Sequence, residues 1–232
     1  MKTAKEARDE LSNAPGSRKA LAVWLPLAGL QVALAFIGAG GGKASTDEPL
    51  YEYDLAIGSG VLYGILAAIT FWIAAAYPSR WEALGLRRFS RSWVGAAAGV
   101  VVASVLVSVA LEPILHAGEE QGLSPEVWRP ERAGAFALNA VVIVTLVPFT
   151  EELFFRGLGV RVLGVFGGAA AVTGTAMIFA LAHGLLVAIP PLLFFGLGLA
   201  WVRLRSGSVW PAVIAHAAYN GAGLAIAYAT IQ

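Results

Sequence analysis

Residues 148–157 read Pro-Phe-Thr-Glu-Glu-Leu-Phe-Phe-Arg-Gly and close an apolar run that is long enough to cross a bilayer. The run therefore carries two adjacent carboxylates, Glu151 and Glu152, and the guanidinium of Arg156. A charge at the centre of a bilayer costs at least about 2.5–3.5 kcal/mol, so such residues are usually paired, face the bundle interior and mark a functional site. The stretch predicts a polar site inside a membrane protein.

The composition agrees with a membrane protein. Hydrophobic residues make up 58% of the chain and charged residues 13%, against about 25% charged in ordinary soluble domains. The mean hydropathy is +0.72, and the apolar residues fall in blocks of the length of membrane-spanning helices. A net charge of +1 without a basic stripe argues against a nucleic-acid partner, and the lack of cysteine excludes disulfides and thiolate chemistry.

The pattern predicts an all-α fold, a polytopic membrane helical bundle of about seven transmembrane helices. A polar arm, residues 1–19, comes first, and the following apolar run is too long for a typical signal peptide. Segment 79–92 mixes arginines with aromatic and leucine residues, which is typical of a short helix in the headgroup region; an ordinary basic loop is the alternative. The predicted spans are 20–39, 55–77, 93–115, 133–155, 168–189, 192–204 and 209–230.

The distribution of basic residues predicts the orientation. With the amino terminus in the cytoplasm, all of the 16 lysines and arginines except Lys43, Arg129 and Arg132 fall on the cytoplasmic side, as the positive-inside rule requires. The span at 192–204 is short for a crossing, and a partial span there reverses the orientation of the last helix. A chain rich in Ala, Gly and Val fits an integral protein of a bacterial inner membrane.

The two adjacent glutamates have different predicted roles. Consecutive residues on a helix point about 100° apart, so both cannot face one site equally. Glu152 precedes Arg156 by four residues, which is the favourable spacing for a helical ion pair. This leaves Glu151 as the unpaired, cavity-facing carboxylate and a candidate general base. The alternative is a structural cap where the span meets the cytoplasm.

Three further polar residues lie in the late spans. His216 and Asn220 are four apart and share a helix face, whereas His183 alone is more simply a packing residue. The predicted boundaries place Glu151 about 7 Å and His183 about 22 Å from the cytoplasmic end. The two meet only if the fourth helix continues past Arg156 or the fifth starts lower.

A zinc site is the alternative use of these side chains. Glu151, His183 and His216 would supply three ligands and leave a fourth position for water. The usual metalloprotease signature, with two histidines four apart around a glutamate, is absent. Metal is therefore left open by the sequence.

Three motifs occur in order: Glu151-Glu152-x-x-x-Arg156, Phe179-x-x-x-His183 and His216-x-x-x-Asn220. Over residues 133–227 the chain thereby resembles the CPBP intramembrane proteases, which include type II CAAX prenyl endopeptidases and Abi-type immunity proteins. A Trp-x-x-Leu-Gly-Leu-Arg-Arg segment at 81–88 adds to the resemblance. The resemblance divides the chain into the arm (1–19), amino-terminal spans with the interfacial segment (20–132) and a catalytic core (133–232).

The resemblance also implies roles for the polar residues. Glu151 and His183 would activate a water molecule for attack on a peptide carbonyl. His216 and Asn220 would donate hydrogen bonds to the developing oxyanion. Glu152 and Arg156 would position these groups without contacting the substrate. No cofactor is required in this scheme, and zinc is the alternative.

The leading hypothesis is an intramembrane endopeptidase that acts on peptide or membrane-protein substrates in contact with membrane lipid. The runner-up is a non-catalytic immunity or scaffold protein of the same family. A small-molecule carrier is a third reading, disfavoured because the sequence shows no internal repeat of the kind found in transporters. Substrate identity and oligomeric state are left open.

Overall fold

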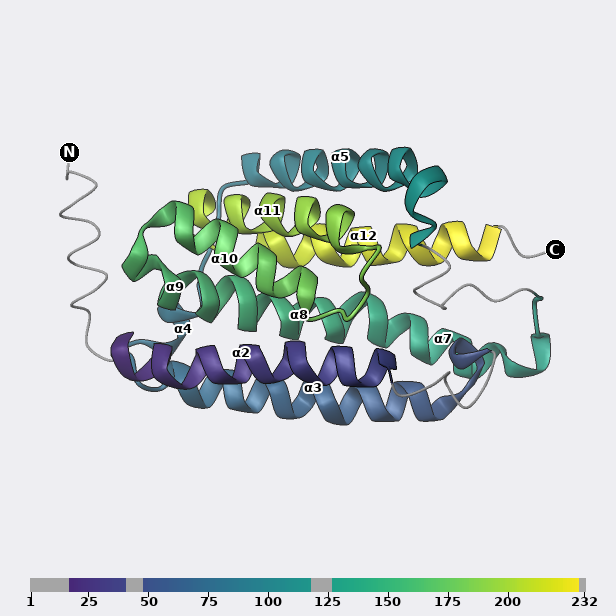
Figure 1. Ribbon diagram of the computed structural model, residues 1–232, viewed down its shortest axis with the longest axis horizontal. Coiled ribbons are helices and arrows are strands. Elements are labelled where there is room, and N and C mark those ends of the chain that lie inside the picture. Colours follow the sequence, from purple (N-terminus) through teal and green to yellow (C-terminus); the bar gives the residue numbers. More distant parts are fainter. Residues whose placement is uncertain (1–16, 41–47, 118–126, 230–232) are drawn as a thin grey trace.

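The computed structural model describes residues 17–40, 48–117 and 127–229, and this part of the chain is a helical bundle without strands (Figure 1). Four helical stretches are long and apolar enough to cross a bilayer: α2 (Ser17–Gly40), α3 (Tyr53–Ala74), α5 (Ser92–Leu115) and the stretch Pro130–Phe166. Helices α10 (Gly168–Leu181), α11 (Ile189–Ser206) and α12 (Trp210–Ala229) pack among them. The predicted all-α membrane bundle is confirmed.

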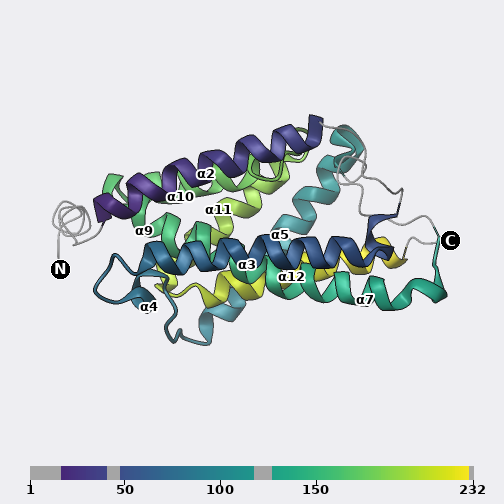
Figure 2. The same ribbon diagram turned by 90° about the horizontal axis from the view of Figure 1, so that it is seen from below.

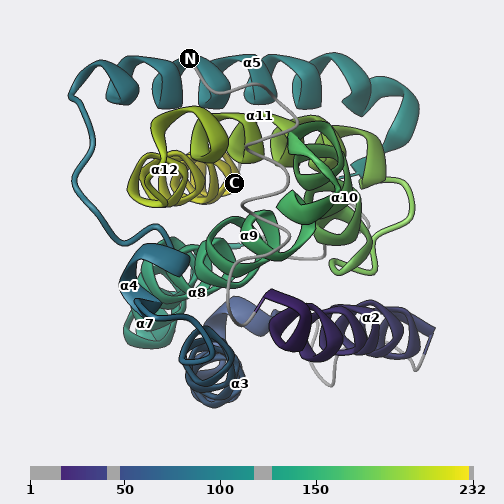
Figure 3. The ribbon, with the colours of Figure 1, turned by 90° about the vertical axis from the view of Figure 1, so that its left-hand side faces the viewer.

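The helices form layers, and Figure 3 shows α2 and α3 nearly end-on on one side and α5 from its side on the other. Helix α5 covers one side, where it contacts α11 and α12. On the other side, α2 lies along α10 and α3 lies along α7 (Ala133–Val141), as Figure 2 also shows. Large apolar side chains of the outer layers, such as Leu62 and Leu106, are exposed, as expected of a surface in contact with lipid.

The stretch Pro130–Phe166 is one long helix in which α and π turns alternate. Its π segments are η3 (Val142–Leu146) and η4 (Glu152–Gly159), which flank α8 (Val147–Glu151). After η4 the helix continues through α9 (Val160–Leu163) and η5 (Gly164–Phe166), whereas the predicted span ended at residue 155. The prediction was wrong because Arg156, read as a boundary, is fully buried in the bundle. Such π segments occur frequently at functional sites.

The chain reverses direction at Gly167, whose φ of 105° is accessible chiefly to glycine. Glu151 and His183 lie equally far along the chain on the two sides of this turn. The hairpin of η4, α9 and α10 therefore brings both to a similar depth, roughly 20 Å from the turn. The predicted boundaries placed Glu151 and His183 at different depths. This difference disappears because the fourth helix continues past Arg156.

The boundary between the fifth and sixth helices also differs from the prediction. Helix α10 ends at Leu181 rather than at residue 189. Pro190 and Pro191 lie in the first turn of α11, where a missing N–H is tolerated, instead of terminating the preceding helix. Helix α11 is therefore 18 residues long, longer than the predicted span at 192–204.

The predicted interfacial helix at 79–92 is reduced to one turn, α4 (Arg80–Ala83). It stops because Gly85 adopts a positive φ of 70°, after which the chain is tied to the turn between α11 and α12. Val209 N donates to Gly85 O (2.9 Å), Arg87 Nε donates to Gly207 O (2.6 Å), and Ser208 Oγ donates to Arg87 O (2.7 Å). We name residues 84–91 the basic strap.

The predicted amino-terminal arm lies almost entirely outside the described residues, and α2 already begins at Ser17. Within α2, Trp24 anchors the helix to the core. Its indole is fully buried, donates a hydrogen bond from Nε1 to Phe154 O (3.0 Å) and stacks on the Phe154 ring at 5.5 Å. The long central helix is thereby attached to the outer layer within its π segment η4.

We expect Trp24→Phe to destabilise the fold by about 1–3 kcal/mol, because it leaves a buried carbonyl without its indole donor. Thermal unfolding in detergent would measure the change. The matched control is Trp72→Phe, since Trp72 is 68% exposed and should tolerate the replacement. Equal midpoints for the two variants would contradict the anchoring role.

Candidate active site

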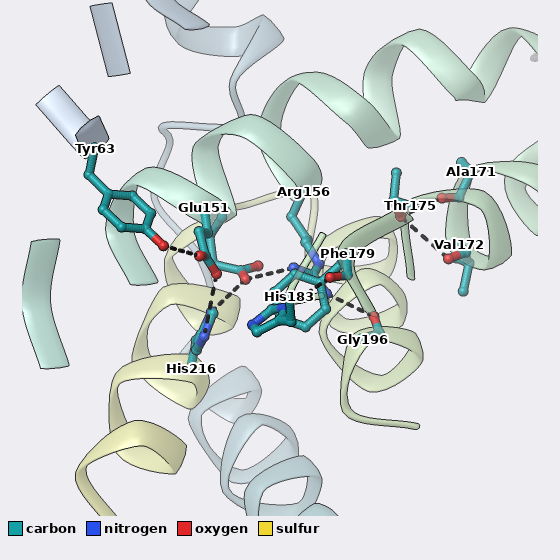
Figure 4. Close-up of polar contacts among 11 residues, drawn as sticks. Tyr63, Glu151, Arg156, Ala171, Val172, Thr175, Phe179, His183, Gly196 and His216 are labelled. Carbon is teal, nitrogen blue, oxygen red and sulfur yellow. Dashed lines mark hydrogen bonds and ion pairs between the residues drawn. The ribbon is translucent and has the colours of Figure 1, made fainter. Parts of the chain in front are cut away.

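The polar residues of the bundle meet where α8 passes into η4 (Figure 4). Glu152 and Arg156 are fully buried, and Glu151 is 8% exposed. Leu153, Phe154 and Phe155, which follow the two acids, are buried as well. The charged groups therefore lie in an apolar interior, where each needs a partner.

Glu152 is the centre of a buried hydrogen-bond network. Its Oε1 accepts hydrogen bonds from Arg156 Nη1 and from His216 Nδ1, both at 2.9 Å. The predicted pair between Glu152 and Arg156 is thus present, and His216 of α12 joins it. Arg156 Nη2 also donates to Gly196 O on α11 (3.3 Å), and its guanidinium lies 4.1 Å from the centre of the Phe179 ring.

Glu151 has a different environment. Its Oε1 accepts a hydrogen bond from Tyr63 OH at 2.7 Å. Its Oε2 is buried, makes no hydrogen bond within the described part of the chain and lies 3.9 Å from His216 Nε2, too far for a direct hydrogen bond. Glu152 Oε2 also lacks a donor, but that carboxylate already contacts two cationic or polarised groups through Oε1.

His183 follows the end of α10 in a non-helical segment, and its Nδ1 lies 2.8 Å from Phe179 O. Because a carbonyl only accepts, Nδ1 carries the proton and Nε2 is left as an acceptor in the neutral ring. The Phe179 ring contacts both imidazoles, with centroids 4.6 Å from His183 and 5.6 Å from His216. The two histidines therefore flank one aromatic ring, yet no hydrogen bond or ion pair joins His183 to Glu151.

Asn220 lies one turn beyond His216 on α12. Its Nδ2 donates to Ile143 O at 3.0 Å, a carbonyl of the π segment η3. The shared helix face expected for His216 and Asn220 is present, but the two side chains contact different elements. The amide nitrogen carries a second hydrogen that this bond does not use.

Tyr63 was not singled out from the sequence. It comes from α3, outside all three motifs, and lies in the middle of a span rather than at its end. A tyrosine at a span end is ordinarily an interface residue. Its position at mid-span, where a hydroxyl needs a partner, was the signal that could have identified it.

A metal site is not assembled by these residues. Across the described ranges, no three His, Cys, Asp or Glu side chains come together as ligands for an ion. In the set considered from the sequence, Glu151, His183 and His216, each histidine uses Nδ1 for a hydrogen bond, to Phe179 O and Glu152 Oε1, and only its Nε2 is left to bind another group.

The segment that carries this site also matches a known family. Residues 133–222 match the family model of Rce1-like type II CAAX prenyl endopeptidases. The resemblance noted from the sequence is thereby confirmed for this region, which includes η4, α10, α11 and most of α12. Neither a curated protein nor a solved structure matches the chain. At the level of the family, the Rce1-like region indicates an intramembrane CAAX-type protease.

Chemically, the Rce1-like region presents a carboxylate and an imidazole toward each other in an apolar environment. Glu151 Oε2 can accept a proton, and His216 Nε2 faces it while Nδ1 is held by Glu152. Such a pair suits acid–base chemistry on a small group placed between them.

The two glutamates should differ in their effect on stability. Glu152→Gln leaves Arg156 buried without its countercharge, so we expect a loss of about 3–5 kcal/mol. Glu151→Gln keeps an oxygen for the Tyr63 hydroxyl and should cost about 1 kcal/mol or less. Thermal unfolding of both variants in one detergent measures the difference. The assignment of roles fails if Glu151→Gln proves the more damaging change.

Proposed function

We propose that this protein is an intramembrane endopeptidase that hydrolyses peptide bonds of membrane-associated peptides or proteins. The observation that carries the proposal is the environment of Glu151. Its Oε2 is buried in an apolar bundle, accepts no hydrogen bond within the described residues and faces His216 Nε2 at 3.9 Å. A carboxylate kept in this state is suited to act as a general base.

In the proposed mechanism, Glu151 takes a proton from a water molecule, and the water oxygen attacks the peptide carbonyl carbon. His183 Nε2 orients this water, since its Nδ1 proton is directed to Phe179 O. The proton on Glu151 then passes to the leaving amine as the C–N bond breaks. These steps balance in protons, and the proposed mechanism uses no cofactor.

The developing oxyanion needs donors in the same place. His216 supplies Nε2–H when its ring is protonated, because Nδ1–H is directed to Glu152. Asn220 supplies the amide hydrogen that does not bond to Ile143 O. Removing one donor of this kind typically lowers kcat by about 100–1000-fold. Glu152 and Arg156 position His216 rather than contacting the substrate.

We further propose that residues 133–232 form the catalytic core and that the amino terminus lies in the cytoplasm of a bacterial cell. The bases of the described ranges support this orientation, since they gather at the end of the bundle where α9 and α11 finish and α2 begins (Figure 1). Those at this end are Arg18, Lys19, Arg80, Arg87, Arg88, Arg91, Arg161, Arg203 and Arg205. Only Arg129 and Arg132 lie at the opposite end among the described residues.

A non-catalytic immunity or scaffold protein is the second candidate. The observation that favours it is that His216, Asn220 and Arg156 all bond groups of neighbouring helices in the structure. In this reading the polar cluster holds η3, η4, α11 and α12 together. It leaves the unsatisfied oxygen of Glu151 unexplained.

The first test is cleavage of a quenched fluorescent peptide library by detergent-purified protein. We expect Glu151→Gln to lower the rate by about 100-fold or more while the protein stays folded. Wild-type activity should persist in a zinc chelator. Loss with chelator and recovery with zinc would replace the metal-free mechanism by a zinc mechanism. Equal rates for wild type and Glu151→Gln would favour the scaffold.

A second prediction concerns Tyr63, which we propose positions Glu151. Tyr63→Phe removes only the hydroxyl that bonds Oε1, so we expect kcat to fall about tenfold as the carboxylate loses its fixed orientation. The KM and the unfolding midpoint should change little. The control is Tyr53→Phe, at the exposed start of the same helix. A raised KM with unchanged kcat would show that Tyr63 serves substrate binding instead.

A further inference from the structure

The basic end of the bundle contains a buried arginine that the proposed mechanism does not use. Arg203, in the last turn of α11, is only 7% exposed. Within the described residues it donates no hydrogen bond, and its buried Nε has no partner. A guanidinium has five N–H donors and stays charged, so burial without an acceptor is costly.

The charges that act on Arg203 are also positive. They belong to Arg87 and Arg161, and Arg161 in turn packs over the Tyr77 ring at 5.3 Å and has a buried Nε without a partner. Arg87 bonds only a carbonyl, Gly207 O. Three cations therefore gather at this end without an acidic partner in the described ranges.

The basic strap contacts Arg203 at Gly85, and its next residues line a hollow in the surface. A Cβ added at Gly85 would lie 2.5 Å from Arg203 Nη2, so the guanidinium lies against the strap at Gly85. Directly after Gly85 begins a hollow of about 830 Å³, lined by Leu86, Arg87, Arg88, Phe89, Arg91 and Trp210. It combines three guanidinium groups with three large apolar side chains, and Arg87 belongs both to the hollow and to the cluster with Arg161 and Arg203.

The location of the hollow selects the chemistry of its occupant. It lies where α11 ends and α5 and α12 begin, at the bundle end that carries most of the bases (Figure 1). Lipid headgroups are found at this level, and arginine is suited to bidentate recognition of phosphate. Trp210 is partly exposed and stacks on Phe149, which gives an acyl chain a surface beside the headgroup.

We propose that this hollow is a binding site for the phosphate group of an anionic phospholipid, with Arg87, Arg88 and Arg91 as its cationic side and Arg203 packed against the strap at Gly85. Leu86, Phe89 and Trp210 contact the glycerol and the first part of the acyl chains. The lipid phosphate supplies a negative charge beside arginines that have no acidic partner among the described residues. The site is separate from Glu151, and it does not depend on the chain being a protease.

The test uses the full-length protein in detergent, titrated with short-chain phosphatidylglycerol, phosphatidylcholine or inorganic phosphate. We expect phosphatidylglycerol to raise the unfolding midpoint with saturation, because a ligand of the folded state stabilises it. Phosphatidylcholine, which carries a compensating cation, and inorganic phosphate should have little effect at equal concentration. Native mass spectrometry would show one phosphatidylglycerol retained per chain.

Three variants decide where the lipid binds. Arg88→Gln and Arg91→Gln, which change two exposed arginines of the lining, should each weaken the apparent affinity about fivefold to tenfold. Arg205→Gln removes the same charge from an exposed position two residues further along α11 and should change nothing. If all three variants weakened the affinity equally, the lipid would be responding to general surface charge, and the proposed site would be wrong.

Two other outcomes also contradict the proposal. Stabilisation by inorganic phosphate as strong as that by lipid would identify a free-phosphate site instead. A variant lacking residues 2–16, which removes Glu6, Asp9 and Glu10, should bind phosphatidylglycerol as the full chain does. Binding that appears only after this deletion would show that the arm, rather than a lipid, occupies the cluster.

Discussion

The guanidinium of Arg156 is completely buried in an apolar bundle, and the arrangement of the core depends on how this charge is compensated. Removing such a group from water costs several kcal/mol, which only well-placed partners offset. Glu152 supplies the countercharge from one turn earlier, and Gly196 O and the Phe179 ring receive the rest of the guanidinium. Because these partners lie on α10 and α11, and His216 of α12 binds the same carboxylate, one buried ion pair fixes three helices around η4.

The π turns and small residues of the long central helix allow the outer layers to approach it. A Cβ at Gly157 would lie 2.9 Å from Leu84 O in the basic strap, and one at Gly159 would lie 2.6 Å from the Trp24 ring. The wide turns also leave carbonyls for side-chain donors, since Phe154 O accepts from Trp24 and Ile143 O accepts from Asn220. The amino-terminal helices, which lie outside the family match, are therefore attached to the Rce1-like region at its π turns.

Contacts between residues a few positions apart could be predicted from the sequence. The errors share one cause, which is that the contacts in question join residues far apart in the chain. The pair Glu152–Arg156 follows from a separation of four residues. The end of the fourth helix was misplaced because an arginine after an apolar run normally marks the membrane surface. The carbonyl of Gly196, to which Arg156 donates, lies far along the chain. Tyr63 and the single-turn form of segment 79–92 were missed for the same reason. The groups that fix them, Glu151 and Val209, lie far away along the chain.

The two glutamates differ in their surroundings, which suggests a structural role for Glu152 and a chemical role for Glu151. A protein that needed only cohesion could keep Glu152, Arg156 and His216 and place an apolar residue at position 151. Instead, Glu151 is held by Tyr63 at one oxygen, while the other is buried without a donor among the described residues. An unsatisfied buried acceptor costs about 1–3 kcal/mol, and more when charged. The proposed mechanism accounts for this cost, because there the free oxygen, 3.9 Å from an imidazole nitrogen, takes up a proton from water.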